Sequence, residues 1–102
     1  MSLANVADFI AFVGHNEAVQ LTQAGHPDMH SPDTGKIQSG LDEAKEILTQ
    51  TVPDTDWPLF KPCQLRIARS LLDPFTSREV VQLGLSQAWE WVESRPKKIL
   101  WT

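Results

Sequence analysis

Proline and glycine divide this chain into short segments, and within those segments apolar residues recur with the spacing of a helix. The clearest segment lies between Gly35 and Pro53. Its apolar residues recur at intervals of four, three and four: Ile37, Leu41, Ala44 and Leu48. This spacing places one apolar stripe along a helix, and the period-two alternation of a half-buried strand is missing outside the last few residues. The pattern predicts an all-α fold, a small bundle of four to five helices around one core with an extended C-terminal tail.

Capping residues mark four further helices. Asn5 and Asn16 are placed to cap two short helices, the first of which ends at Gly14. Pro62 suits the first turn of another helix, and Thr76 with Glu79 forms the capping box of the last one. Together with the helix that starts at Lys36, the expected helical ranges are residues 6–13, 17–23, 36–52, 62–72 and 77–95.

Two stretches rich in proline are expected to be non-helical. Residues 24–35 hold two Pro and two Gly, which predicts an exposed loop. Residues 53–62 hold three Pro and predict a stiff connector that presents Trp57 and Phe60. We expect these two aromatic side chains at a protein interface.

Length and charge limit the class of protein. A chain of 102 residues is the size of one domain, which we divide into a helical domain, 1–95, and an extended C-terminal arm, 96–102. A net charge of −4 argues against a protein that grips nucleic-acid phosphates. No apolar run approaches the roughly 20 residues that span a bilayer, so we expect no membrane partner and synthesis in the cytoplasm.

Catalytic chemistry is not encoded in a visible motif. Four possible metal ligands lie in the first proline-rich stretch: His26, Asp28, His30 and Asp33. Pro27 and Pro32 disfavour the helix that would bring the two histidines together, so a solvated polar loop is the favoured interpretation. Cys63 has no general base near it in sequence, and a buried structural cysteine is favoured over a nucleophile. We therefore expect no enzyme activity, no metal and no cofactor.

Basic residues could form a stripe along the last two helices. Arg66 and Arg69 lie three residues apart, and four more basic residues flank the last helix: Arg78, Arg95, Lys97 and Lys98. No aromatic residue interleaves with them on the same helix face. We therefore expect solvated or ion-paired arginines rather than a phosphate-binding surface.

The tryptophans favour a protein partner. Trp89 and Trp91 lie about 200° apart on one helix, so at least one is expected at an edge or an interface. The tail beyond Pro96 adds two lysines and an apolar cluster that could fill a neighbour's groove, although folding back onto its own bundle stays open. The expected interface residues are Trp57, Phe60, Trp89, Lys97, Lys98, Ile99, Leu100 and Trp101.

Three stretches occur in a fixed order along the chain: ADFIAFVG-HNEAVQLT, GLDEAKEIL, and AWEWV followed by KKIL. Their order resembles the Mu-like head–tail joining family of phage head–tail connector (head completion) proteins. The opening ADFIAFVG-HNEAVQLT resembles that family's short helix, glycine stop and second helix. The middle GLDEAKEIL resembles its A-L-x-x-A helix, and AWEWV followed by KKIL resembles its closing pattern. The matching positions are Asp8, Ile10, Gly14, Glu17, Gln20, Leu21, Thr22, Gly40, Leu41, Ala44, Ala88, Trp91, Val92, Lys98 and Ile99.

The resemblance implies a structural subunit of the virion, at the head–tail junction. Such proteins assemble as a homo-oligomeric ring, commonly a dodecamer, on the portal protein and present a platform to the tail or to a second neck protein. DNA would pass through the lumen without specific binding, which suits an acidic subunit. Two alternatives remain open: a small helical adaptor or regulator unrelated to virions, and a small hydrolase that uses Cys63 or a metal at His26 and His30.

Overall fold

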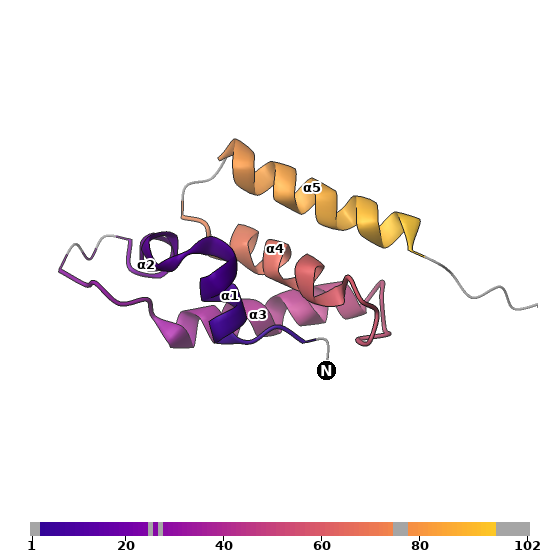
Figure 1. Cartoon of the computed structure of the whole chain (residues 1–102), viewed down its shortest axis with the longest axis horizontal. Helices are drawn as coiled ribbons and strands as arrows, with labels where there is room; N and C mark the ends of the chain where they lie inside the picture. Colours follow the sequence, from indigo (N-terminus) through magenta and orange to yellow (C-terminus); the bar gives the residue numbers. More distant parts are fainter. Residues whose placement is uncertain (1–2, 25, 27, 75–77, 96–102) are drawn as a thin grey trace, which may run out of the picture.

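The computed structural model describes residues 3–24, 26, 28–74 and 78–95, and these residues form five α-helices (Figure 1). The all-α prediction is confirmed, and no strand occurs in these ranges. None of the described helices is both long and apolar enough to cross a bilayer. The helices are α1 Val6–Val13, α2 His15–Thr22, α3 Thr34–Thr49, α4 Phe60–Leu72 and α5 Glu79–Ser94.

Helix α4 is the centre of the bundle. It packs against α3 on one side and α5 on the other, while the short helices α1 and α2 cover one end of α3 and α4. In Figure 1, α5 forms an outer layer above α4, on the side away from α3. Because its packing is concentrated on a single neighbour, α5 keeps much of its surface in solvent.

The predicted apolar stripe of α3 is confirmed. Ile37, Leu41, Ala44 and Leu48 are all fully buried, against Phe9 from α1 and other core residues. Gly40 lies between these positions at the contact with α4, where an added Cβ would come within 2.9 Å of a Leu72 side-chain carbon. The small residue therefore allows the two helices to approach closely.

The first helix begins as expected and the second does not. The Asn5 side chain accepts a hydrogen bond from the Asp8 amide, and the Asp8 carboxylate accepts one from the Asn5 amide, which completes a capping box. Gly14, at φ +88°, is both the C-cap of α1 and the N-cap of α2. The expectation that Asn16 caps α2 is wrong, because this glycine conformation lets the next helix start at His15.

The third helix starts earlier than Lys36. Asp33 caps it, accepting a hydrogen bond from the Lys36 amide, so the helix includes Thr34 and Gly35. The Asp33 amide in turn donates to the buried hydroxyl of Thr22 at 2.9 Å. This bond joins the end of α2 to the start of α3. The helix also ends earlier than expected, at Thr49.

The last two helices also differ from expectation at their starts. Helix α4 begins at Phe60, within the stretch expected to be a non-helical connector, and Pro62 lies in its first turn as expected. Glu79 is the first residue of α5 rather than its third, so the expected capping box does not describe this helix start; Thr76 lies outside the described residues. Leu71, near the end of α4, is 40% exposed, because the buried face runs through Cys63, Gln64, Ile67 and Ala68.

Candidate interaction surface

Helix α5 has two faces of different character. Val81, Ala88 and Val92 are buried. On the other side Val80 is 55% exposed and Leu83 is 61% exposed. Successive residues of an α-helix are rotated by about 100° around its axis, and this spacing places four exposed residues on the side of α5 that faces away from the bundle. We call these positions the outer strip: Val80, Leu83, Gln87 and Glu90.

The charge of α5 is entirely negative. Its three charged residues between Glu79 and Ser94 are exposed glutamates: Glu79, Glu90 and Glu93. Arginines stand only at its caps, Arg78 and Arg95. The outer strip therefore combines an apolar end with acidic neighbours.

Behind α5, an arginine is held between two aromatic rings. The Arg66 guanidinium carbon lies 4.6 Å from the ring centroid of Trp91 on α5 and 5.1 Å from that of Phe12 on α1. Arg69 also lies over Phe12, at 5.8 Å. Burial, reinforced by the nearby charge of Arg69, lowers the pKa of Arg66. The sequence analysis considered only aromatic residues on the same helix face, whereas these two rings come from other helices.

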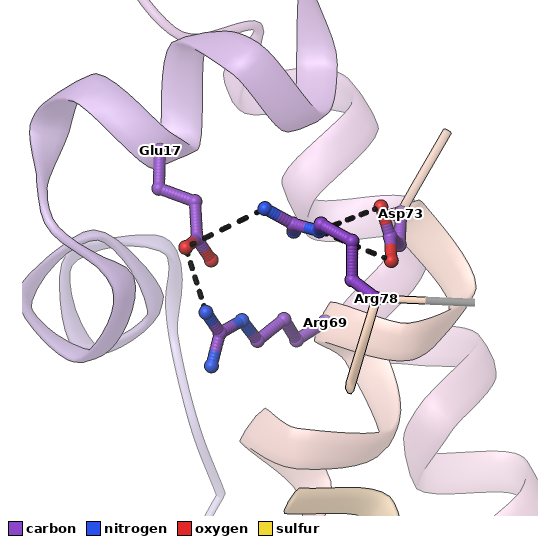
Figure 2. Close-up of polar contacts among 4 residues, drawn as sticks. All are labelled: Glu17, Arg69, Asp73 and Arg78. Carbon is purple, nitrogen blue, oxygen red and sulfur yellow. Dashed lines mark hydrogen bonds and ion pairs between the residues drawn. The ribbon is translucent and has the colours of Figure 1, made fainter. Parts of the chain in front are cut away.

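Two other arginines belong to an ion-pair network that joins three parts of the fold (Figure 2). The Glu17 carboxylate on α2 lies 2.6 Å from the Arg69 guanidinium on α4 and 4.0 Å from that of Arg78. Arg78, at the start of α5, also lies 3.3 Å from the Asp73 carboxylate. All four side chains are largely buried. The network fixes the start of α5 against α2 and α4.

The other end of α5 is held by Arg95. Its guanidinium donates to the Val92 carbonyl in the last turn of α5, at 2.7 Å. It also donates to the Thr51 carbonyl, which lies in the connector after α3, at 2.9 Å. Both ends of α5 are thus fixed to the bundle by arginine caps, while its outer strip makes no such contact with the described part of the chain.

The structure corrects two of the expected interface residues. Phe60 is fully buried and Trp57 is 9% exposed, and both belong to the hydrophobic core. The reason is that α4 begins at Phe60, and the Phe60 amide donates to the Trp57 carbonyl at 2.9 Å, so the connector folds inward at this point. These two side chains are therefore not presented to a partner.

The tryptophans of α5 have intermediate exposure. Trp89 and Trp91 are both half-buried and pack against the margins of the core. The remaining expected interface residues lie outside the described part of the chain: Lys97, Lys98, Ile99, Leu100 and Trp101.

The expected metal ligands do not come together. Within the described ranges no group of three or more His, Cys, Asp or Glu side chains is arranged to hold a metal ion. His26, Asp28 and His30 are exposed, and Asp33 caps α3. The His30 carbonyl lies 3.0 Å from the His15 ring.

Cys63 has the environment of a structural cysteine. It is fully buried, and its thiol donates to the Ala88 carbonyl at 3.4 Å. Burial raises the pKa of this thiol to about 11. Because the thiolate is the nucleophilic form, this position is poorly suited to covalent catalysis.

The outer strip is the feature that sequence reasoning missed. Val80 and Val81 are neighbouring apolar residues at the start of α5. Adjacent residues on a helix lie about 100° apart, so burial of Val81 directs Val80 to the flank. That angular relation was a usable signal, whereas the exposure of Leu83 depends on how little of the bundle covers α5.

Comparison with protein-family models, with curated proteins and with solved structures found no match for this chain.

Proposed function

We propose that this chain is a structural subunit that assembles with copies of itself and with other proteins, and that the assembly is a phage head–tail connector. The observation that carries the proposal is the outer strip, which places Val80 and Leu83 in solvent on a helix whose two ends are firmly held. Rigid elements with exposed apolar side chains are typical of surfaces that bind proteins.

The specific role comes from the sequence resemblance. A connector subunit would form a ring between the portal and the tail, and a ring needs two different patches on each copy. The outer strip supplies one such patch. The net charge of −4 supports a lumen through which DNA slides, since a negative wall repels phosphates.

The buried Cys63 supports a role without catalysis. Its raised pKa and its lack of exposure disfavour the hydrolase alternative at that residue. A small adaptor would use the same outer strip on one partner. Assembly size separates an adaptor from a connector.

The experiment is to measure the mass of the purified full-length protein by light scattering, alone and mixed with a portal protein, and to image both samples by electron microscopy. We expect a large symmetric ring in at least the mixture. A protein that stays small with every portal tested would contradict the connector role and favour the adaptor.

A matched pair of variants connects the result to α5. Leu83→Asp places a charge in the outer strip, whereas Gln82→Asp places the same charge on an exposed position about 100° away. We expect the first variant to lose assembly and the second to keep it. Circular dichroism would verify that both variants remain helical.

A further inference from the structure

We propose that the outer strip of one copy binds residues 97–101 of a second copy, so that Val80 and Leu83 pack against Ile99, Leu100 and Trp101. This inference rests on the proposed function in that it requires the chain to self-assemble. It adds the identity of the two surfaces that meet. Three properties of the chain support it: apolar complementarity, charge and reach.

The two surfaces complement each other in apolar character. Val80 and Leu83 are a turn apart and are 55% and 61% exposed. The segment that follows α5 carries three consecutive large apolar residues, Ile99 to Trp101. Burying Val and Leu side chains of this size against an aromatic anchor is the usual source of binding energy in small interfaces.

They also complement each other in charge. The residues of α5 from Glu79 to Ser94 include three glutamates and no lysine or arginine. The segment after α5 opens with Lys97 and Lys98 and contains no acidic residue. Opposite charges on the two surfaces favour their encounter and fix their register. This pairing also fits the outer strip, where Glu90 follows Leu83 by two helical turns.

The length of the segment favours binding to α5 of a second copy over binding to α5 of its own chain. Leu83 precedes Arg95 by 12 residues and Val80 precedes it by 15, which corresponds to about 18 and 22 Å along the helix axis. Trp101 follows Arg95 by six residues, so even a fully extended chain spans at most about 20 to 22 Å. The segment must also reverse direction, which shortens this span. Within one chain it therefore falls short of covering both residues, whereas a neighbouring copy has no such limit.

The experiment is disulfide trapping between two singly substituted full-length chains. One preparation carries Leu83→Cys and the other carries Leu100→Cys, and the two are mixed and oxidised. Native Cys63 is fully buried and is expected to stay inert, which the unsubstituted protein verifies. We expect cross-linked dimers containing one chain of each kind. Gln82→Cys, paired with Leu100→Cys, is the control and should give little cross-linking.

A third protein that carries both Leu83→Cys and Leu100→Cys in one chain tests whether residues 97–101 bind the outer strip of their own chain or that of a second copy. Cross-linking only within this chain, with none in the mixture, would overturn the inference and assign the segment to its own helix. Assemblies that form normally but give no cross-link would overturn the inference and leave the connector role standing. A protein that never assembles would instead remove the proposed function itself.

Charge reversal gives an independent readout. Lys97→Glu combined with Lys98→Glu should weaken assembly, and Glu79→Lys combined with Glu90→Lys should restore it in that background. Assembly that is unaffected by the lysine changes would contradict the proposed register.

Discussion

The side-chain amide of Gln64, on α4, donates a hydrogen bond of 2.9 Å to the main-chain carbonyl of Leu41, on α3. The oxygen of the same side chain accepts a hydrogen bond of 2.9 Å from the Ala4 amide. Gln64 is 2% exposed, so one buried side chain joins the N-terminal segment to both helices.

Gln64→Leu should lower the free energy of unfolding by about 1–3 kcal/mol, because it leaves the buried Ala4 amide without an acceptor. Urea denaturation followed by circular dichroism would measure the loss. Gln38→Leu, at an exposed position on α3, is the control and should change stability by less than about 0.5 kcal/mol. Equal effects at the two positions would contradict a structural role for the Gln64 bonds.

Leu41→Ala and Leu83→Ala should differ sharply in effect. Leu41 is fully buried, so its truncation should cost about 2–5 kcal/mol, counting the cavity left behind. Leu83 is 61% exposed, so its truncation in the isolated subunit should stay within about 0.5 kcal/mol. Thermal or urea unfolding at low protein concentration would compare them. A large loss at Leu83 would mean that its own chain covers it.

Cys63 should resist thiol reagents in the folded protein. A pKa raised to about 11 leaves little thiolate at neutral pH, and the side chain has no exposed surface. Reaction with a chromogenic disulfide should therefore be slow in buffer and fast in urea. Fast reaction under native conditions would show that α4 and α5 open readily around this residue.

Cys63 should also make stability fall in alkaline solution. The folded state favours the neutral thiol, so its contribution is complete below the ordinary thiol pKa of about 8.5 and decreases as the pH rises toward 11. We expect this part of the pH dependence between about 8.5 and 11 to disappear in Cys63→Ala. Unfolding midpoints across that range, for both proteins, would test it.

Asp8 should contribute to stability in the opposite pH range. The hydrogen bond from the Asn5 amide, assisted by Lys61 at 3.2 Å, lowers the pKa of this carboxyl. Its contribution is present above the ordinary Asp pKa of about 3.9 and is lost as the pH falls through the lowered value. Asp8→Asn should therefore be less stable than the native chain at pH 7, and the difference should close in acid. Glu46→Gln, at an exposed position on α3, is the matched control.

The ion pair between Glu17 and Arg69 should show measurable coupling. Their side chains are 19% and 17% exposed, and the two charged atoms lie 2.6 Å apart. A double-mutant cycle with Glu17→Gln and Arg69→Met should give a coupling energy of about 0.5–3 kcal/mol. The more exposed pair of Asp8 and Lys61 should give less, about 0.2–1 kcal/mol. Equal values would mean that burial does not strengthen the Glu17 pair.

The fold class and the core of α3 could be predicted because they depend on local spacing. Ile37 and Leu48 are buried simply because they share one face of an amphipathic helix. The starts of the helices were harder to predict from sequence. Asp33 and Gly14 act as caps through hydrogen bonds and a backbone angle that only the folded chain defines. For Phe60, a start two residues earlier changed an expected surface residue into a core residue.

The candidate surface was harder to predict because it depends on contacts distant in sequence. Arg66 meets Phe12 across 54 residues and Trp91 across 25, so no local pattern reveals the stacking. The exposure of Leu83 likewise follows from the number of helices that cover α5. Spacing along α5 does not contain that information.

The contacts of Arg95 determine more than the stability of the last turn of α5. Its bonds to the Val92 and Thr51 carbonyls fix where residue 95 stands relative to the whole bundle. If successive copies are linked through the residues beyond it, each copy is related to the next by the same rotation and the same rise. A rise of zero with a rotation that divides a full turn closes the series into a ring, whereas a nonzero rise extends it into a filament. The symmetry of the assembly would then depend on two hydrogen bonds at the end of one helix.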